Sequence, residues 1–342
     1  MKKLSILLFA CGAAIIAIAW TNGNLHTTTN LDFTQNQGDN KVLMLTKSFN
    51  SSDINKVKVN TFTVSEGNIE VVGNADNQTT VEMYVQSNRN ENLSKEKIQQ
   101  LLNNYNIVID VSKGILTVNA NCKVENNTLS FSFKIHTAKK VSTDLITSGG
   151  DIMLASLHGN EVFTTSGGKL RIDDVSGNIN GTASGGNIEA NNCFGDIRML
   201  TSGGNITVNN LNGNTKIATS GGIIEAQNIS GGLQASTAGG SITAQFNKIT
   251  DDIGLFTSGG NIAITIPQNA ALLLDLKGSS IHHTNISLAP GYTTETPGET
   301  IVNGIINGGG ATLKARASDG KIDLMTTPLS EKGVTEKKIK SN

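Results

Sequence analysis

Pairs of adjacent glycines recur along this chain at a nearly constant interval, and no other feature restricts its fold as strongly. From the first pair to the sixth, the five steps between successive pairs are equal. Only the step from the sixth pair to the seventh, which begins at Gly259, is longer. The members of the seven pairs are Gly149, Gly150, Gly167, Gly168, Gly185, Gly186, Gly203, Gly204, Gly221, Gly222, Gly239, Gly240, Gly259 and Gly260. A fixed period of this length is typical of architectures in which each repeat stacks on the previous one.

Each 18-residue repeat divides into two nine-residue halves with a glycine at the third position. In the half that begins at Ser184, Ile188 and Ala190 are apolar and Glu189 between them is polar. Alternation with a period of two predicts a strand with one buried face. Nine residues allow a strand of about five residues and a tight turn, where glycine adopts backbone angles that other residues avoid. The chain is therefore predicted to be all-β: a parallel β-solenoid (β-helix) with 18-residue coils, two main strands each, and one short inserted helix.

The regularity of this pattern divides the chain into segments. The pattern is clear in the middle and weaker on both sides, where Ser94, Ile98 and Leu101 indicate the capped, one-sided helix. Two additional residues around Asn247 to Asp252 fit a bulged turn. The predicted segments are 20–40, a spacer; 41–146, the β-rich N-terminal part of the solenoid, with a helix at 94–104; 147–266, the regular repeats; 267–327, less regular coils and an end cap; and 328–342, a disordered tail.

The segment 1–19 has the pattern of an export signal. A cationic start, Met1-Lys2-Lys3, precedes an apolar run that ends in Ala17-Ile18-Ala19, which favours cleavage before Trp20. Leu8-Phe9-Ala10-Cys11 also fits a bacterial lipoprotein signal, in which Cys11 is acylated, and an uncleaved membrane anchor is the third alternative. All three place the remaining chain outside the cytoplasmic membrane: at the cell surface, in the periplasm or in the medium. Membrane contact is expected only through this anchor or lipid.

Composition argues against several classes of function. The 27 Lys and Arg residues balance 28 Asp and Glu residues, so the net charge is −1. This gives no concentrated positive charge for nucleic acid. Three cysteines make neither a disulfide framework nor a four-ligand zinc site. Cys193 falls at an inward position and is expected to be a buried thiol, with a Cys122–Cys193 disulfide as the alternative.

Repeats with paired glycines also occur in calcium-binding β-rolls, where an aspartate recurs in the turn. The residue after each pair is here, in order, Asp151, Lys169, Asn187, Asn205, Ile223, Ser241 and Asn261. Only one of these seven is a carboxylate, so the turn is expected to be structural and no metal or cofactor is predicted. The Thr and Ser residues before the pairs are expected to satisfy backbone groups of the turn.

Two sets of outward residues are candidates for a site. Arg198 and Lys216 occupy equivalent positions in neighbouring repeats and would form a small anion-binding patch. Glu189 and Glu225 lie two repeats apart, about 9.6 Å at the strand spacing, near the wide end of the carboxylate separation in inverting glycosidases. A solvated polar face is the preferred interpretation, because aromatic platforms for sugar rings are nearly absent. No catalytic residue is therefore assigned.

The chain resembles bacterial adhesin-like families of unknown function that are built as β-solenoids on exported proteins. The resemblance is carried by the Thr-Ser-Gly-Gly-x-Ile units, by Asn307-Gly-Gly-Gly-Ala-x-Leu and by Ser318-Asp-Gly-Lys-Ile, and it covers roughly residues 41 to 324. It implies a surface or periplasmic interaction protein. These families supply no functional residues to transfer.

The predicted function is a non-enzymatic, exported interaction protein of the surface or envelope, whose ligand is a glycan or a protein. One alternative is a carbohydrate-active enzyme, a lyase or hydrolase, on the same scaffold. The other is a self-assembling or sensory scaffold of the envelope.

Overall fold

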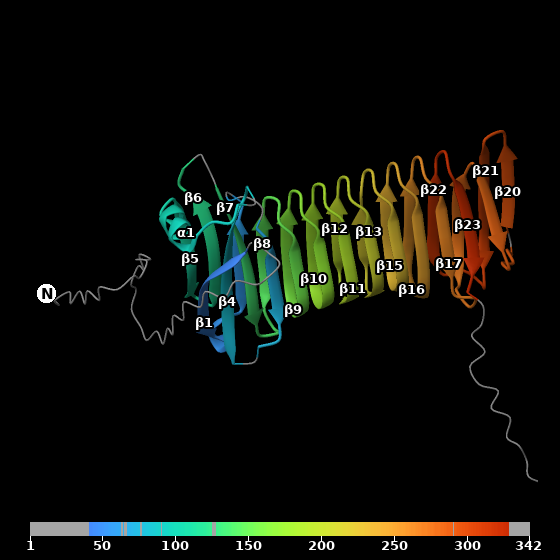
Figure 1. Ribbon diagram of the computed structural model, residues 1–342. Helices are drawn as coiled ribbons and strands as arrows, with labels where there is room; N and C mark the ends of the chain where they lie inside the picture. The colour runs from blue at the N-terminus through green and yellow to red at the C-terminus, as the bar shows by residue number, and fades with distance from the viewer. Residues whose placement is uncertain are drawn as a thin grey trace, which may run out of the picture.

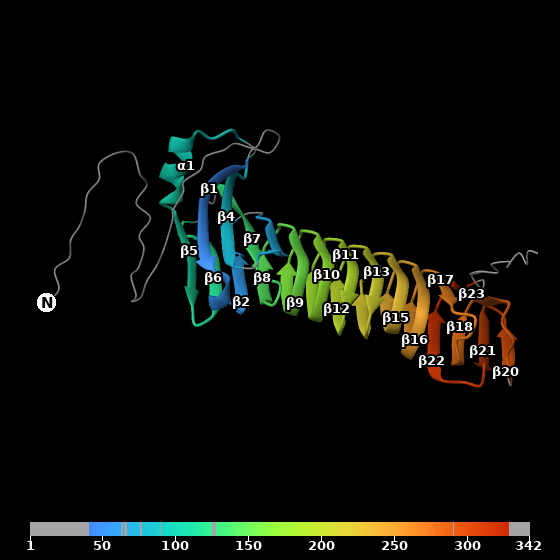
Figure 2. The same ribbon diagram turned by 90° about the horizontal axis from the view of Figure 1, so that it is seen from below.

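The computed structural model describes residues 41–327 except 63, 65–66, 76, 90, 125–127 and 290. In this part the chain is almost entirely β, as predicted, and its 23 strands belong to one hydrogen-bonded sheet. Figures 1 and 2 show the strands as one long row, with the N-terminal strands at one end and β20 at the other. The predicted export signal with Cys11, the spacer and the C-terminal tail lie outside the described residues.

The N-terminal strands and helices are β1 (Val42–Asn50), the 3-10 helix η1 (Ser51–Asp53), β2 (Lys56–Thr61), β3 (Ile69–Gly73), β4 (Gln78–Ser87), α1 (Lys95–Leu102), β5 (Tyr105–Ser112), β6 (Ile115–Cys122), β7 (Leu129–Thr137) and β8 (Ser142–Thr147). The helix lies within the predicted 94–104 and begins after the predicted cap, because the Ser94 hydroxyl accepts a hydrogen bond from Lys97 N–H at 3.3 Å. Ile98 is its buried residue, and α1 lies beside β5 at the N-terminal end of the row (Figure 2). It is too short and too polar to cross a membrane, and no other described segment forms a candidate helical span.

The repeat region contains β9 (Ile152–Thr165), β10 (Leu170–Ala183), β11 (Ile188–Phe194), β12 (Ile197–Thr201), β13 (Ile206–Asn212), β14 (Thr215–Ala218), β15 (Ile224–Thr237), β16 (Ile242–Thr257) and β17 (Ile262–Ile266). Its strands pair in parallel with the equivalent positions of the next repeat, and this confirms the predicted register: Ile188 pairs with Ile206, and Ile206 with Ile224. The second halves do the same, since Ile179 pairs with Ile197 and Ile197 with Thr215.

The two halves of the repeats therefore form two continuous parallel ladders. We call the ladder of the first halves wall A; its residues are 152–155, 170–173, 188–191, 206–209, 224–227, 242–245 and 262–265. We call the ladder of the second halves wall B; its residues are 161–165, 179–183, 197–201, 215–218, 233–237 and 253–257. In β9, β10, β15 and β16 a single strand runs through both walls.

The predicted two-residue insertion is present within β16, just before the part of this strand that belongs to wall B. Gly231 pairs with Ile249 at the usual interval, whereas Leu233 pairs with Ile253, two positions beyond that interval. The additional residues therefore lie just before Ile253, and regular stacking continues after them.

The C-terminal part is formed by β18 (Leu272–Gly278), β19 (Ser280–Thr284), β20 (Gly291–Thr296), β21 (Glu299–Ile306), β22 (Ala311–Ala317) and β23 (Lys321–Thr326). Here the spatial order departs from the order along the chain. β22 stacks directly on β16, and Ile322 of β23 pairs with the much earlier Ile262. The intervening β18 and β19 lie beyond β22 and β23, and β21 and β20 extend the wall B ladder as antiparallel strands.

Inward side chains of the repeats form columns that fill one hydrophobic core. Ile188, Ile206 and Ile224 are fully buried, and the same cluster extends from Met44 to Leu324. Burial of a side chain of this size contributes about 2 kcal/mol. Because each repeat supplies only a few such residues, the ladders to both neighbours are needed for stability.

The role predicted for the paired glycines was wrong in one respect. Neither glycine of a pair has a positive φ; left-handed angles occur instead at Asn192 (φ 54°) and Gly195 (φ 118°), and at their equivalents in other repeats. The second glycine is required by contact, because a Cβ on Gly204 would lie 2.1 Å from the carbonyl oxygen of Gly186. A Cβ on the first glycine, Gly203, would have no neighbour closer than 3.9 Å. The repeats thus approach each other too closely at the second glycine for any side chain.

Candidate functional site

The outward side chains of the two walls form rows across successive strands, because residues in register lie one strand spacing, about 4.8 Å, apart. The central row of wall A contains Arg171, Glu189, Thr207, Glu225 and Thr243. The central row of wall B contains Asn180, Arg198, Lys216, Gln234 and Gly254. The structure therefore places the sequence-predicted acids on one wall and the predicted cations on the other.

On wall A, Glu189 already has a cationic partner. The Arg171 guanidinium donates to Glu189 Oε2 through Nη2 at 3.0 Å and through Nε at 3.2 Å, and both side chains are solvent-exposed. Glu225 is exposed and lies between Thr207 and Thr243. A general acid is usually a carboxyl group whose pKa is raised in an enclosed site, and this wall provides neither glutamate with such an enclosure.

On wall B, Arg198 and Lys216 are direct cross-strand neighbours in β12 and β14. Both are exposed, and neither forms an ion pair or hydrogen bond with a described side chain. Their lateral neighbours in the row, Asn180 and Gln234, are neutral. Two adjacent like charges without a counter-ion repel each other by about 1 kcal/mol at the surface. The arrangement leaves two cationic groups available to an anion.

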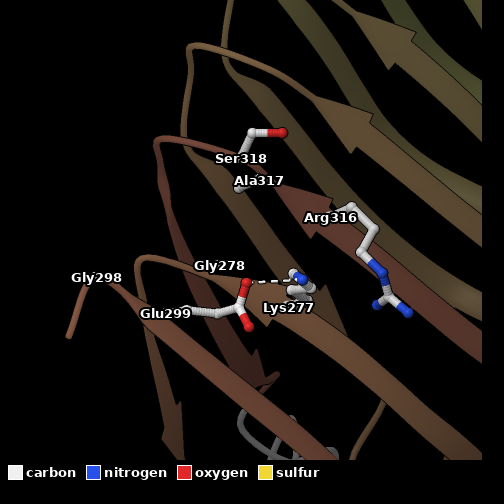
Figure 3. Close-up of a pocket in the computed structure, with 7 residues that line it drawn as sticks. All are labelled: Lys277, Gly278, Gly298, Glu299, Arg316, Ala317 and Ser318. Atoms are coloured by element: carbon white, nitrogen blue, oxygen red, sulfur yellow. Dashed lines mark ion pairs between the residues drawn. The ribbon is translucent and has the colours of Figure 1, made fainter. Parts of the chain in front are cut away.

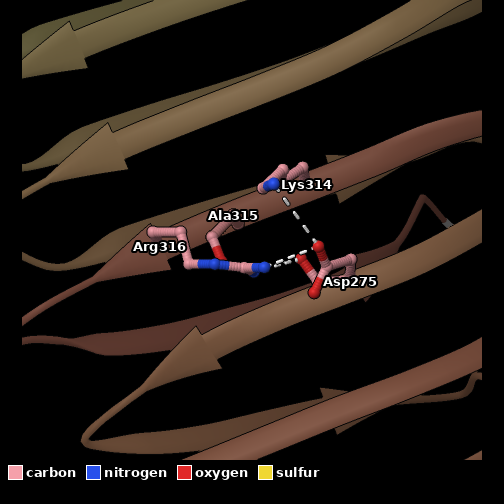
Figure 4. Close-up of polar contacts among 4 residues, drawn as sticks. All are labelled: Asp275, Lys314, Ala315 and Arg316. Carbon is pink, nitrogen blue, oxygen red and sulfur yellow. Dashed lines mark hydrogen bonds and ion pairs between the residues drawn. The ribbon is translucent and has the colours of Figure 1, made fainter.

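Further along the wall B ladder, a second group of cations is neutralised by an acid. Asp275 in β18 accepts from Arg316 Nη2 at 2.5 Å and lies 3.8 Å from Lys314 Nζ (Figure 4). Arg316 also donates through Nη1 to the carbonyl oxygens of Asp275 and Ala315, at 2.7 and 3.0 Å. Arg316 is thus fixed by β18 and its own strand rather than free to bind a ligand.

A small hollow lies beside this group, lined by Lys277, Gly278, Gly298, Glu299, Arg316, Ala317 and Ser318 (Figure 3). Its volume is about 60 Å³, and two of its lining residues form an ion pair, Lys277 Nζ with Glu299 Oε1 at 2.7 Å (Figure 3). This volume admits only a few water molecules, whereas ligand pockets are usually several hundred Å³. The hollow is therefore too small to enclose a substrate.

The side chains after the glycine pairs have a structural role that explains their amide and carboxylate oxygens. Asn187 Oδ1 accepts from the backbone N–H of Asn205 at 2.9 Å, and Asn205 Oδ1 accepts from that of Ile223 at 2.9 Å. Asp151 accepts from Lys169 N–H in the same way, at 2.7 Å. In the part of the chain that the structure describes, no group of three or more His, Cys, Asp or Glu residues is arranged to hold a metal ion.

The threonines before the pairs also satisfy backbone groups, as predicted. The Thr219 hydroxyl donates to the Gly204 carbonyl at 2.8 Å and accepts from Gly222 N–H at 3.2 Å. Thr201 makes the equivalent bonds in the preceding repeat. Each hydroxyl thus links its own turn to the neighbouring one.

The alternative of a Cys122–Cys193 disulfide was wrong, because both thiols are free. Cys193 fills an inward position of β11 and is fully buried. Burial raises the pKa of its thiol to about 12. Since the thiolate is the reactive form, Cys193 is a packing residue and not a nucleophile.

Wall B also contains a buried carboxyl group that was not predicted from the sequence. Glu161 occupies the inward position that Ile179 fills in the next repeat, and its side chain is fully buried. Thr143 Oγ1 donates to Glu161 Oε2 at 2.5 Å, while Oε1 has no hydrogen-bond partner. Burial raises the pKa of Glu161 to about 7. The sequence contained the signal for this burial. Gly159 is the glycine at the third position of its nine-residue half, and Glu161 stands two positions after it, where the other repeats place an inward side chain.

No protein-family model matches the chain, and no curated protein matches its sequence. Its fold is similar to a structure described as a putative adhesin from Parabacteroides distasonis, with 17% identity, a TM-score of 0.47, and coverage of 82% of this chain and 96% of that one. It is also similar to a putative lipid binding protein from the same species (13% identity, TM-score 0.41, 82% and 95% coverage) and a putative adhesin from Parabacteroides merdae (17%, 0.40, 82% and 95%). These likenesses assign no function.

Proposed function

We propose that this chain is an exported β-solenoid that acts as a non-enzymatic interaction protein and binds a surface ligand through its outward walls. The observation that carries the proposal is the register of the outward rows. Each wall places outward side chains, most of them polar, at a regular spacing over at least five consecutive parallel strands. Such a surface binds by many contacts spread over a rigid face and not by enclosure of a small molecule.

The way in which the repeats stack supports a role of the outward side chains in ligand binding. Inward columns, corner glycines and turn threonines are all used in holding one repeat to the next. Side chains such as Glu225, Arg198 and Lys216 are not used in that way, because they are exposed and lie outside these contacts. Residues that the fold does not need are the ones available for recognition.

Fractionation of the producing cells, combined with intact-mass analysis of the mature chain, tests export. A mature chain that begins at Trp20, or at an acylated Cys11, is expected, and a full-length chain recovered in the cytoplasm contradicts the proposal. Binding of the purified full chain to intact cell surfaces tests the interaction itself. Depolymerisation of acidic glycans by the wild-type chain, lost in Glu189→Gln or Glu225→Gln, would replace this proposal with the enzymatic alternative.

A further inference from the structure

We infer that wall B binds an acidic polysaccharide laid along the stack, with its anionic groups on Arg198 and Lys216 and a sugar ring on Phe256. This inference deepens the proposed function, on which it rests, by naming the ligand class and the residues. It is carried by two neighbouring rows of wall B that differ in chemistry.

The first of these is the cationic row. Arg198 and Lys216 stand side by side, exposed and without an acid partner among the described residues. Several other surface cations on the walls and their extension are neutralised, as Arg171 is by Glu189 and Lys277 is by Glu299. An incoming carboxylate or sulfate would therefore relieve a repulsion on wall B, and would gain charge-assisted hydrogen bonds from a guanidinium and an ammonium group.

The second is the adjacent outward row, two positions further along each strand. Its members in register are Thr164, Thr182, Leu200, Ala218, Ser236 and Phe256, so apolar side chains lie beside the two cations, at Leu200 and Ala218, and at Phe256. The corresponding row of wall A is polar and contains Asp173, Asn191, Asn209 and Gln227. Wall B therefore combines an unpaired pair of cations with nearby apolar side chains, which suits a polymer whose sugar rings have apolar faces and whose substituents are anionic.

Phe256 is an aromatic platform that the sequence analysis did not find. Its ring lies over Gly254 of the same strand, since a Cβ on Gly254 would fall 2.9 Å from Phe256 Cε2. The side chain of Gln234 covers the same glycine from the neighbouring strand, with Oε1 2.1 Å from that point. Phe256 remains 36% exposed. A ring packed against the wall over a glycine leaves one face available for stacking.

The spacing of these residues fits an extended ligand. From Arg198 to Phe256 the strip crosses β12, β14, β15 and β16, which is about 14 Å at the strand spacing. Gln234 lies between the cations and the ring, and its Nε2 donates a hydrogen bond to the Asp252 carbonyl oxygen at 3.5 Å. Two unpaired cations are few for a nucleic acid, whose binding depends on many phosphate contacts. This favours a polymer with intermittent negative charge.

The test measures binding of the full chain to immobilised polygalacturonate and dextran sulfate, with neutral dextran, duplex DNA and anionic phospholipid vesicles as comparisons. The wild-type chain is expected to bind one or both acidic glycans and to bind less tightly as salt increases. The double variant Arg198→Gln/Lys216→Gln should bind at least about tenfold more weakly, and Phe256→Ala several-fold more weakly. The acidic glycan that binds identifies carboxylate or sulfate as the preferred group.

Arg171→Gln is the matched control, since it removes an exposed cation from wall A and should leave binding unchanged. Unaltered thermal unfolding shows that each variant is folded. Equal affinity of the double variant and the wild type, equal binding of neutral dextran, or stronger binding of DNA or vesicles would overturn the inference.

Cell-surface binding distinguishes failure of this inference from failure of the proposed function. Surface binding that persists in the double variant would overturn the inference and leave the proposed function intact. Absence of surface binding by the wild-type chain would overturn both.

Discussion

Glu161 is the residue whose replacement should change the behaviour of the protein most informatively. Its carboxyl group is buried between Thr143 and Ile179 of the same inward column, and only one of its oxygens is hydrogen-bonded. Ionisation of this group in the folded chain is unfavourable because the charge cannot be solvated. We therefore expect the folded chain to become less stable as the pH rises.

The sign and size of the effect follow from the two pKa values of Glu161, about 7 in the folded chain and 4.5 for an ordinary glutamate. Between these values the folded chain binds more protons than the unfolded chain, so the free energy of unfolding falls with increasing pH. The stabilising contribution of the protonated form is fully present below pH 4.5 and is lost as the pH rises through 7. The difference of the pKa values corresponds to about 3 kcal/mol.

Urea unfolding of the full chain at pH 5, 6, 7 and 8 measures this contribution. Relative to wild type, Glu161→Gln should gain stability with pH, by about 2.5 kcal/mol between pH 5 and pH 8. Glu161→Leu provides a second variant without a titratable group and with an aliphatic side chain like that of Leu233 at the equivalent position. Hydrogen exchange of β8 and β9 should localise the change. Parallel pH profiles for the wild type and both variants would refute the reasoning.

Two further predictions concern the corner glycines and the thiols. Gly204→Ala should destabilise the chain by about 3 kcal/mol, because its Cβ would meet the Gly186 carbonyl, whereas Gly203→Ala should change stability by less than about 0.5 kcal/mol; equal thermal unfolding of the two variants would contradict the close-contact argument. Iodoacetamide at pH 8 should modify the partly exposed Cys122 in the folded chain and leave the buried Cys193 unmodified until urea is added. Mass spectrometry reports the modified sites, and equal rates at both would show that Cys193 is accessible.

The repeat region could be predicted well because one local signal set both the turns and the register. Once paired glycines recur at a constant interval, parallel pairing of Ile188 with Ile206 follows from the period alone. The role of each glycine did not follow in the same way. A turn can require glycine because of its free φ or because it lacks a Cβ. The sequence does not tell these two reasons apart, whereas the position of the Gly186 carbonyl against Gly204 shows that the second applies here.

The C-terminal part was harder to predict because its contacts are not local. The segment between β17 and β22 leaves the stack and returns, so that Ile322 pairs with Ile262 from the last regular repeat. Nothing in the spacing of residues 267–310 indicates that they lie beyond a repeat that comes later in the chain. The candidate site was predictable in part. Arg198 and Lys216 were found from their position in the repeat, whereas Phe256 was missed because the two-residue insertion moves it out of the regular numbering.

The two walls differ in how their charges are paired, and the proposed ligand accounts for this difference. A stack of parallel strands can place opposite charges in register at little cost, and wall A does so with Arg171 and Glu189. Such a pair contributes up to about 1 kcal/mol, and a like-charged pair costs a similar amount. Arg198 beside Lys216 therefore makes the folded chain slightly less stable than a pair of neutral residues would. A pair of positions that costs stability fits the ligand proposed above, whose anionic groups would supply the missing negative charge.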